Sequence, residues 1–205
     1  MNITALLRRF ANYVTADIRT HVPAQVISFD PNNLTVDVQV AIQGVRISKT
    51  GTLIQLDTGE RVLAENYNLA PILKVPISIL WQRNKGITLP INAGDYGTLL
   101  VCDRDISAFK KSQSIAAQAS LRKFDLNDSI FLPFLPAKAS ISDYSASSID
   151  VRYGATKIKV SATGVDITGN LTVSGNATIG GIPFGSHKHS YLNGSAPSTT
   201  GGPQA

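Results

Sequence analysis

The sequence predicts an all-β protein with a small barrel near its N-terminus and a glycine-rich stalk near its C-terminus. Residues 24–102 contain runs in which polar and apolar side chains alternate, separated by turn-forming residues, as expected for strands. Residues 148–179 contain shorter runs of the same kind, broken by glycines at close intervals. Helical spacing of apolar residues stands out only in residues 2–20, which predicts a short N-terminal helix.

The predicted N-terminal helix carries six apolar side chains at helical spacing. Such a helix either packs on its own domain or docks on a neighbouring protein. Docking is the favoured interpretation, because a helix at a chain end is easily shared. The six residues are Ile3, Leu6, Leu7, Phe10, Val14 and Ile18.

The predicted barrel begins with a β-hairpin. Two alternating runs, residues 24–30 and 34–40, are joined by residues 30–33, whose Asp-Pro-Asn-Asn sequence favours a turn. A less regular connection is expected from residue 45 to about residue 68. About five antiparallel strands with little helix indicate an OB-fold-like barrel. The later strand signals lie at residues 77–81, 96–102 and 126–134.

The stalk consists of very short predicted strands, each with only two or three apolar residues on one face. A single chain folded in this way buries too little surface to offset the entropy lost on ordering it. A flexible tail rich in Ser, Thr and Gly is the alternative, but it does not explain the regular spacing of Ile, Val and Leu. We therefore expect copies of the chain to supply each other's core, as neighbouring repeats do in a β-solenoid. The runs are residues 148–153, 157–160, 165–167, 171–173 and 177–179.

Two histidines, His187 and His189, follow the stalk with Lys188 between them. In a strand, residues i and i+2 point to the same face, so both imidazoles would face a shared axis. Three chains around that axis would bring six nitrogens together, which is an octahedral set. Imidazole suits Zn, Cu, Fe and Ni, and six-coordination disfavours Zn. The sequence thus predicts a metal site formed by His187 and His189 from several chains.

The composition agrees with a rigid β-rich assembly. Hydrophobic residues make up 43% of the 205 residues and allow a core, whereas charged residues make up only 16%. The net charge of +5 comes from scattered basic residues, the densest cluster being Lys110 and Lys111, so a solvated surface is expected and a nucleic-acid partner is not. No apolar stretch approaches the length of a membrane helix. Arg8 and Arg9 interrupt any secretory signal, so synthesis and folding in the cytoplasm are expected.

No residue pattern indicates an enzyme. Glu60 and Glu65 are the only glutamates, and they would lie in a connection without the features of a glycosidase pocket. His21 has no partner for triad chemistry, and neither a nucleophile elbow nor a P-loop is present. Cys102 lies in an apolar run and is expected to be a buried small hydrophobe. We expect no catalytic site and no small-molecule substrate.

Several motifs, taken in order, resemble the membrane-puncturing central spikes of contractile phage tails. Residues 26–36 resemble the first hairpin of that family's OB domain, and residues 122–128 resemble the stretch that ends it. His187-Lys188-His189, followed by residues 200–203, resembles the apex. Further matching segments are residues 74–77, 89–97 and 103–106.

The resemblance implies a homotrimer that pierces the host outer membrane during infection. The OB-fold-like domain would dock on the tail hub or another baseplate protein, and the stalk would be an intertwined three-chain β-helix. The apex would hold one iron ion through His187 and His189 of all three chains, and the protein would belong to the virion, at the tail tip. The implied domains are a helix (residues 1–22), the OB-fold-like domain (23–135), the β-helix (136–184) and the apex (185–205).

Two other functions remain open from the sequence. One is a tip protein of a related contractile injection system. The other is an OB-fold nucleic-acid-binding module with a β-solenoid stalk, which requires exposed aromatic side chains beside a basic groove. Trp81 and Phe29 are the candidates, but both lie in strongly apolar runs, where core packing is expected.

Overall fold

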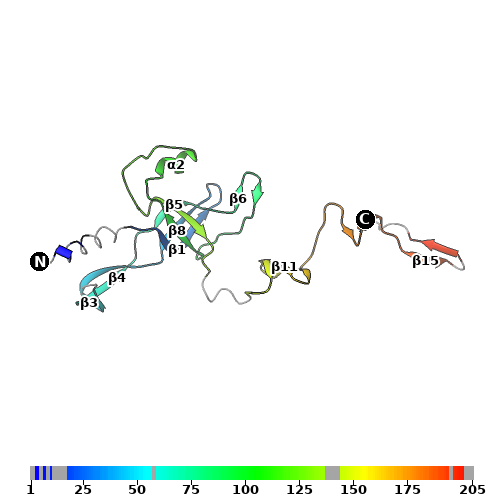
Figure 1. Cartoon of the computed structure of the whole chain (residues 1–205), viewed down its shortest axis with the longest axis horizontal. Coiled ribbons are helices and arrows are strands. Elements are labelled where there is room, and N and C mark those ends of the chain that lie inside the picture. Colours follow the sequence, from blue (N-terminus) through cyan, green and yellow to red (C-terminus); the bar gives the residue numbers. More distant parts are fainter. Residues whose placement is uncertain are drawn as a thin grey trace. The chain divides into compact units, whose positions relative to one another are not determined.

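A five-stranded antiparallel sheet is the centre of the N-terminal part of the protein (Figure 1). The sheet curls into a half-barrel, and a single parallel bridge between Ile77 and Phe131 joins the ends of the strand order β5-β2-β1-β8-β9. The predominance of strands confirms the all-β prediction, and a closed OB-fold barrel remains the finer expectation. The strands are β1 (His21–Asp30), β2 (Thr35–Val40), β5 (Ile72–Pro76), β8 (Tyr96–Val101) and β9 (Ser129–Pro133).

The structure is a computed structural model that describes residues 3, 4, 7, 10, 18–56, 59–136, 144–193 and 196–200. The chain divides into two compact units, Met1–Ser142 and Asp143–Ala205. The described residues contain little helix, namely α2 (Ser107–Ser112), the 3-10 turn η2 (Phe184–Ser186) and the helical residues Ile3, Thr4, Leu7 and Phe10. The rest of the predicted N-terminal helix, up to residue 17, lies outside the described residues. No described helix has the length and apolar character needed to cross a membrane.

The core of the first unit lies on the inner face of the curled sheet. Strand β2 alternates as a half-buried strand should, with Val36, Val38 and Val40 buried between more exposed neighbours. Phe131 on β9 is fully buried and packs where β8 carries Gly97. A Cβ atom at Gly97 would lie 2.3 Å from the Phe131 ring, so only glycine fits there.

The β1–β2 hairpin is formed as predicted. The Asp30 carboxylate accepts hydrogen bonds from the main-chain N–H groups of Asn32 (2.9 Å) and Asn33 (3.3 Å) and from the Asn33 side chain (2.7 Å). The bond from the Asn33 side chain is the main reason why the pKa of Asp30 is lowered. The turn chemistry recognised in the sequence is thus the chemistry that closes the hairpin.

The expected irregular connection between residues 45 and 68 is wrong, because this stretch forms a long hairpin of β3 (Gly44–Gln55) and β4 (Arg61–Tyr67). The pairing shifts register between Ile47 and Thr52, so a bulge interrupts the alternation by which strands are recognised. Glu65 holds the bulge by accepting hydrogen bonds from Arg46 (3.1 Å) and Thr50.

The strand expected at residues 77–81 is also displaced. The third strand of the half-barrel is β5, which ends at Pro76, and only Trp81 of the expected run lies in a strand, the two-residue β6 (Trp81–Gln82). β6 pairs with β7 (Lys85–Gly86) in a small hairpin. Trp81 is 50% exposed, so the expectation that it packs in the core is wrong. Phe29 does pack against the core.

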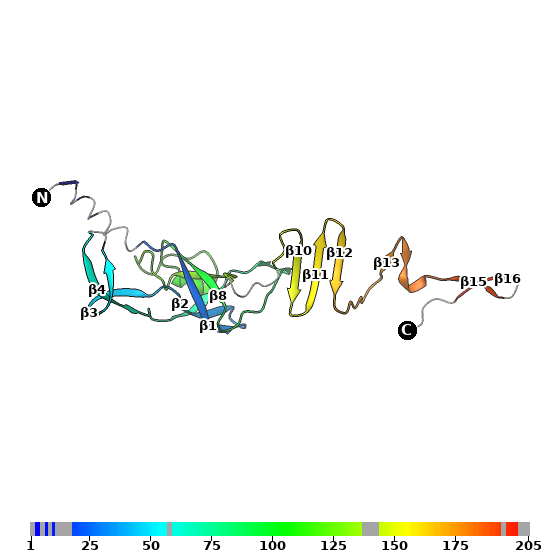
Figure 2. The same cartoon turned by 90° about the horizontal axis from the view of Figure 1, so that it is seen from below.

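In the second unit, three of the predicted stalk strands form an antiparallel meander (Figure 2). Gly154, at φ +57°, lies in the turn between the first two strands. Residues 171–173, predicted as a strand, are irregular and pair with no strand among the described residues. The strands are β10 (Ile149–Tyr153), β11 (Thr156–Ser161) and β12 (Gly164–Thr168), followed by the hairpins β13 (Thr178–Ile179) with β14 (Ile182–Pro183) and β15 (Ser190–Asn193) with β16 (Ala196–Thr199).

Candidate metal site and assembly surface

One face of the β10–β12 sheet is entirely apolar apart from its edge at the β10–β11 turn. The register places Ile149, Val160 and Val165 in one row across the sheet and Val151, Ile158 and Ile167 in the next. All six side chains are between 42% and 71% exposed in the single chain. A contiguous exposed patch of this kind marks an interaction surface on a soluble protein. We call these six residues the apolar face.

The opposite face of the same sheet is charged. Asp150, Lys159 and Asp166 lie in one row, so that opposite charges alternate across the strands. The Asp150 carboxylate is 2.9 Å from the Arg152 guanidinium and 3.8 Å from Lys157 Nζ. The pKa of Asp150 is lowered, first by the hydrogen bond from the Ser148 hydroxyl and then by that from Arg152. This face is suited to water, whereas the apolar face requires a cover.

The two predicted metal ligands lie side by side. The ring centroids of His187 and His189 are 5.1 Å apart, and the planes meet at 89°. The sequence placed them in a strand, but residues 187–189 precede β15 and belong to no strand. Their side chains are nevertheless brought together, His187 partly buried and His189 exposed.

The ring of His187 is fixed by a hydrogen bond. Its Nδ1 lies 2.6 Å from the main-chain oxygen of Phe184. A carbonyl oxygen only accepts, so Nδ1 carries the proton and the neutral ring keeps its lone pair on Nε2. The Phe184 ring also packs against the His187 ring, with centroids 4.9 Å apart. η2 therefore supplies both a hydrogen-bond acceptor and an aromatic contact that orient His187.

The main chain of His189 is held by Thr200. The N–H of His189 donates to the Thr200 hydroxyl at 2.9 Å, and the N–H of Thr200 donates to the carbonyl of His189 at 2.8 Å. This reciprocal pair extends the β15–β16 hairpin by one step beyond the partners Ser190 and Thr199.

This donor set fits a transition metal such as iron. Ligating histidines normally donate their second ring nitrogen to a carbonyl or carboxylate, as His187 does here. Imidazole nitrogens also suit iron as ligands. One chain supplies only two such rings, and in the part of the chain that the structure describes no third His, Cys, Asp or Glu joins a cluster with them. A complete coordination shell at this position would need ligands beyond these two rings.

The remaining residues considered from the sequence do not come together. The pKa of Glu65 is lowered, mainly by its hydrogen bond from Thr50, and its carboxylate belongs to the β3–β4 bulge. His21 begins β1, opposite Leu100. Cys102 is half-buried, and burial raises the pKa of its thiol, which disfavours the reactive thiolate.

A buried ionic cluster holds the long loop between β8 and β9, a feature that the sequence did not single out. Arg122 donates to both carboxylate oxygens of Asp128 at 3.2 Å and lies 3.3 Å from Asp105. The side chains of Asp105 and Asp128 are 1% and 2% exposed. The Asp128 carboxylate also accepts the N–H of Ile106 at 3.2 Å. The cluster ties the start and the end of the loop to β9.

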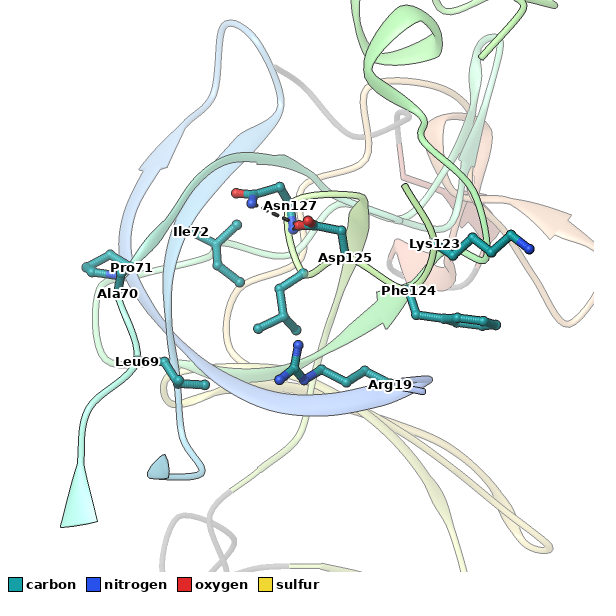
Figure 3. Close-up of a pocket in the computed structure, with 10 residues that line it drawn as sticks. Arg19, Leu69, Ala70, Pro71, Ile72, Lys123, Phe124, Asp125 and Asn127 are labelled. Atoms are coloured by element: carbon teal, nitrogen blue, oxygen red, sulfur yellow. Dashed lines mark hydrogen bonds between the residues drawn. The ribbon is translucent and has the colours of Figure 1, made fainter. Parts of the chain in front are cut away.

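A cavity of about 370 Å³ lies beside the same loop (Figure 3). Arg19 and Phe124 line one side, and Asp125 and Asn127 another. Asp125 accepts hydrogen bonds from the main chain (2.8 Å) and side chain (2.9 Å) of Asn127, so this carboxylate serves the turn. The residues that line the cavity lie far apart in the sequence, so no short sequence pattern indicates it.

Residues 22–134 match the family model described as the phage protein Gp138 N-terminal domain, which covers more than half of the chain. The match spans the five-stranded sheet, the β3–β4 hairpin and the loop with the ionic cluster. The second unit lies outside the matched residues. No curated protein matches the chain.

Proposed function

Because the chain belongs to the family of the phage protein Gp138 N-terminal domain, and is therefore a phage structural protein, we propose that it is the central spike of a contractile tail. In this role it is a homotrimer at the tip of the baseplate, and it pierces the outer membrane of the host cell during infection. It is a mechanical component of the virion and not an enzyme, and it takes no small-molecule substrate.

The observation that carries the proposal is the exposed apolar face of the β10–β12 sheet. Three copies around one axis bury the three apolar faces against each other and leave the rows with Asp150, Lys159 and Asp166 in water. Such an assembly is elongated along the axis and has a continuous dry interior. A thin stalk with a packed interior resists bending, which a piercing device needs.

His187 and His189 belong at the end of this stalk. Three chains supply six imidazoles there, and the proposed metal is one iron ion per trimer. A bound metal would cross-link the three chains at the apex. The chain itself contributes the preset Nδ1–H tautomer of His187 and the close approach of the two rings at 5.1 Å.

The N-terminal unit is the proposed docking collar for the tail hub or another baseplate protein. Ile3, Leu7 and Phe10 are between 62% and 72% exposed on the described helical residues. The β6–β7 hairpin adds Leu80 at 74% and Trp81 at 50% exposure. Exposed large apolar and aromatic side chains of this kind favour a protein interface.

Nucleic-acid binding is the second candidate, favoured by one observation. Trp81 is half exposed beside the basic residues Arg83 and Lys85 on the β6–β7 hairpin. Phe29, the other aromatic candidate, packs against the core. Of the two candidates, only Trp81 is therefore exposed for stacking on a base. Salt-sensitive binding of single-stranded DNA at micromolar affinity, lost in Trp81→Ala, would favour this function over the spike.

Immunogold labelling of intact particles tests the proposed function. An antibody against residues of the first unit should label the distal end of the tail, and particles lacking the protein should adsorb without infecting. Labelling along the sheath or on the head would contradict the proposal. A tip location on an injection machine without a phage head would instead favour the related contractile system.

A further inference from the structure

The two proposed metal ligands are oriented by different means. The ring of His187 has its own hydrogen bond, from Nδ1 to the oxygen of Phe184 at 2.6 Å. The ring of His189 has no hydrogen bond among the described residues, and its only ring contact there is the edge-on contact with His187. The direction of the His189 side chain therefore depends on how firmly its main chain is held.

The main chain of His189 is held on both sides of its Cα atom by one residue. Its N–H donates to Thr200 Oγ1 at 2.9 Å, and its carbonyl accepts from the Thr200 N–H at 2.8 Å. From this geometry we infer that Thr200 is a positioning residue for His189, which keeps that imidazole beside the ring of His187 for a shared metal ion. The inference rests on the metal site of the proposed function.

The chemistry of threonine suits this task. Its hydroxyl supplies the acceptor that the N–H of His189 needs, and its β-branch restricts χ1, so the oxygen is already in place before metal binds. Valine has nearly the same shape but no acceptor, and serine keeps the acceptor without the branch. In a site shared by three chains, a substitution at Thr200 removes this hydrogen bond in every chain. Three imidazoles are then misplaced at one metal ion, so the effect on metal binding is larger than that of one misplaced ring.

The same contacts link the metal to the last hairpin. If Thr200 holds His189 in its ligating position, metal binding must in turn stabilise the hydrogen bonds between the two residues, because linkage is reciprocal. Metal binding should then slow the hydrogen exchange of the Thr200 amide, which donates to His189. Because His189 and Thr200 are 11 residues apart, no short sequence pattern indicated that they are hydrogen-bonded.

Co²⁺ binding to the purified full-length chain is the test, because Co²⁺ reports coordination by its visible spectrum. Thr200→Val should weaken Co²⁺ binding by about tenfold or more, measured by competition with a chelator, and alter the spectrum. Thr200→Ser should restore the parent spectrum and most of the affinity. Thr178→Val, the same change in the β13–β14 hairpin, where Thr178 pairs with Pro183, should behave like the parent.

Parent affinity and spectrum in Thr200→Val would overturn the inference and leave the proposed function intact. A parent that binds neither Co²⁺ nor Fe²⁺ would instead reject the metal site, and the positioning role with it. If Thr200→Val fails to fold, hydrogen exchange of the unmodified protein decides. A Thr200 amide that exchanges markedly more slowly with Co²⁺ than without it supports the inference, and equal rates contradict it.

Discussion

At the scale of single residues, the N-terminal unit depends on charges that are buried only because they are paired. Asp128 is 2% exposed and receives two bonds from Arg122 and one from the main chain of Ile106. Arg122 is 45% exposed, so water still reaches the cation. The balance between the cost of desolvation and the gain from charge attraction therefore differs from that of a fully buried ion pair, because only the carboxylates lose their hydration.

Asp128→Ala should lower the free energy of unfolding by about 2 kcal/mol, because it removes charge-assisted hydrogen bonds and leaves the partly buried N–H of Ile106 without its acceptor. Urea denaturation of the parent and the variant measures this difference. The control is Asp103→Ala, which removes an exposed pair with Arg104 at 3.4 Å and should cost less than about 0.5 kcal/mol. Equal effects of the two changes would show that the cluster does not stabilise the loop.

The second carboxylate of the cluster predicts sensitivity to acid. Its hydrogen bond from Ser107, then that from Ser120, and the nearby Arg122 hold the pKa of Asp105 well below its usual range. A lowered folded-state pKa stabilises the fold above the unfolded pKa of about 3.9, and this contribution is lost as pH falls below that value. Stability should therefore drop between pH 5 and pH 2, estimated roughly from that reference value, and less steeply in Asp105→Asn. Parallel pH profiles for the two proteins would contradict this assignment.

At the scale of elements, apolar and polar side chains alternate along the strands of the β10–β12 sheet, which leaves one apolar face uncovered. Its three strands bond to each other within the chain, and its apolar face is open to side-chain contacts from neighbouring copies. The interwoven three-chain β-helix expected from the sequence for residues 136–184 remains a prediction. Side-chain packing alone would make the copies depend on each other, since leaving a contiguous apolar face in water is unfavourable.

Ile167→Asp should prevent assembly, because it places a carboxylate on the apolar face of each copy, at a cost of several kcal/mol per site. Thr168→Asp is the matched control, since Thr168 lies on the charged face opposite Lys157. Size-exclusion chromatography with light scattering should show assembled Thr168→Asp and unassembled or aggregated Ile167→Asp. Assembly of both variants would mean that the apolar face is covered in another way.

Removing the metal should affect only the apex. The histidines lie between η2 and β15 and are held by Phe184 and Thr200, whereas the apolar face contains no metal ligand. A chelator should therefore speed hydrogen exchange at His189 and Thr200 and leave the amides of β11 unchanged. Dissociation of the whole assembly on chelation would show that the metal, and not the apolar face, holds the copies together.

Local alternation and turn chemistry predicted much of the fold. The β1–β2 hairpin and the three strands β10, β11 and β12 follow from short-range patterns and are present, whereas the pairing of these three strands within one chain was not predicted. The β3–β4 hairpin was missed because its bulge between Ile47 and Thr52 breaks the period of two. The third strand of the half-barrel was placed too late because residues 77–81 are apolar enough to resemble a strand, while β5 ends at Pro76.

The sequence predicted the ligands of the candidate site but not the residues that hold these ligands in place. The pattern His187-Lys188-His189 is visible in the sequence, and the two rings are adjacent in the structure. The contacts of Phe184 and Thr200 depend on how the chain turns back on itself, which residue spacing does not specify. The ion pair of Arg122 with Asp105 was also not predictable from residue spacing, because it joins the two ends of a loop.

At the scale of the whole molecule, each unit exposes large apolar side chains on a different kind of surface. The first has a packed core, a matched family and exposed apolar side chains on its helical residues and on the β6–β7 hairpin. The second has regular strands but a bare apolar face, and among the described residues it brings only two candidate metal ligands together, His187 and His189. Both features are explained if the working form is an assembly of identical chains fixed to another tail protein.

Native mass spectrometry of the full-length protein, combined with elemental analysis, tests this account most directly. A threefold assembly predicts a single species with three times the mass of the chain and about one metal ion, iron by expectation, for every three chains. His187→Ala/His189→Ala should keep the trimer mass and lose the metal. A folded monomer or dimer as the stable species would contradict the account at its centre.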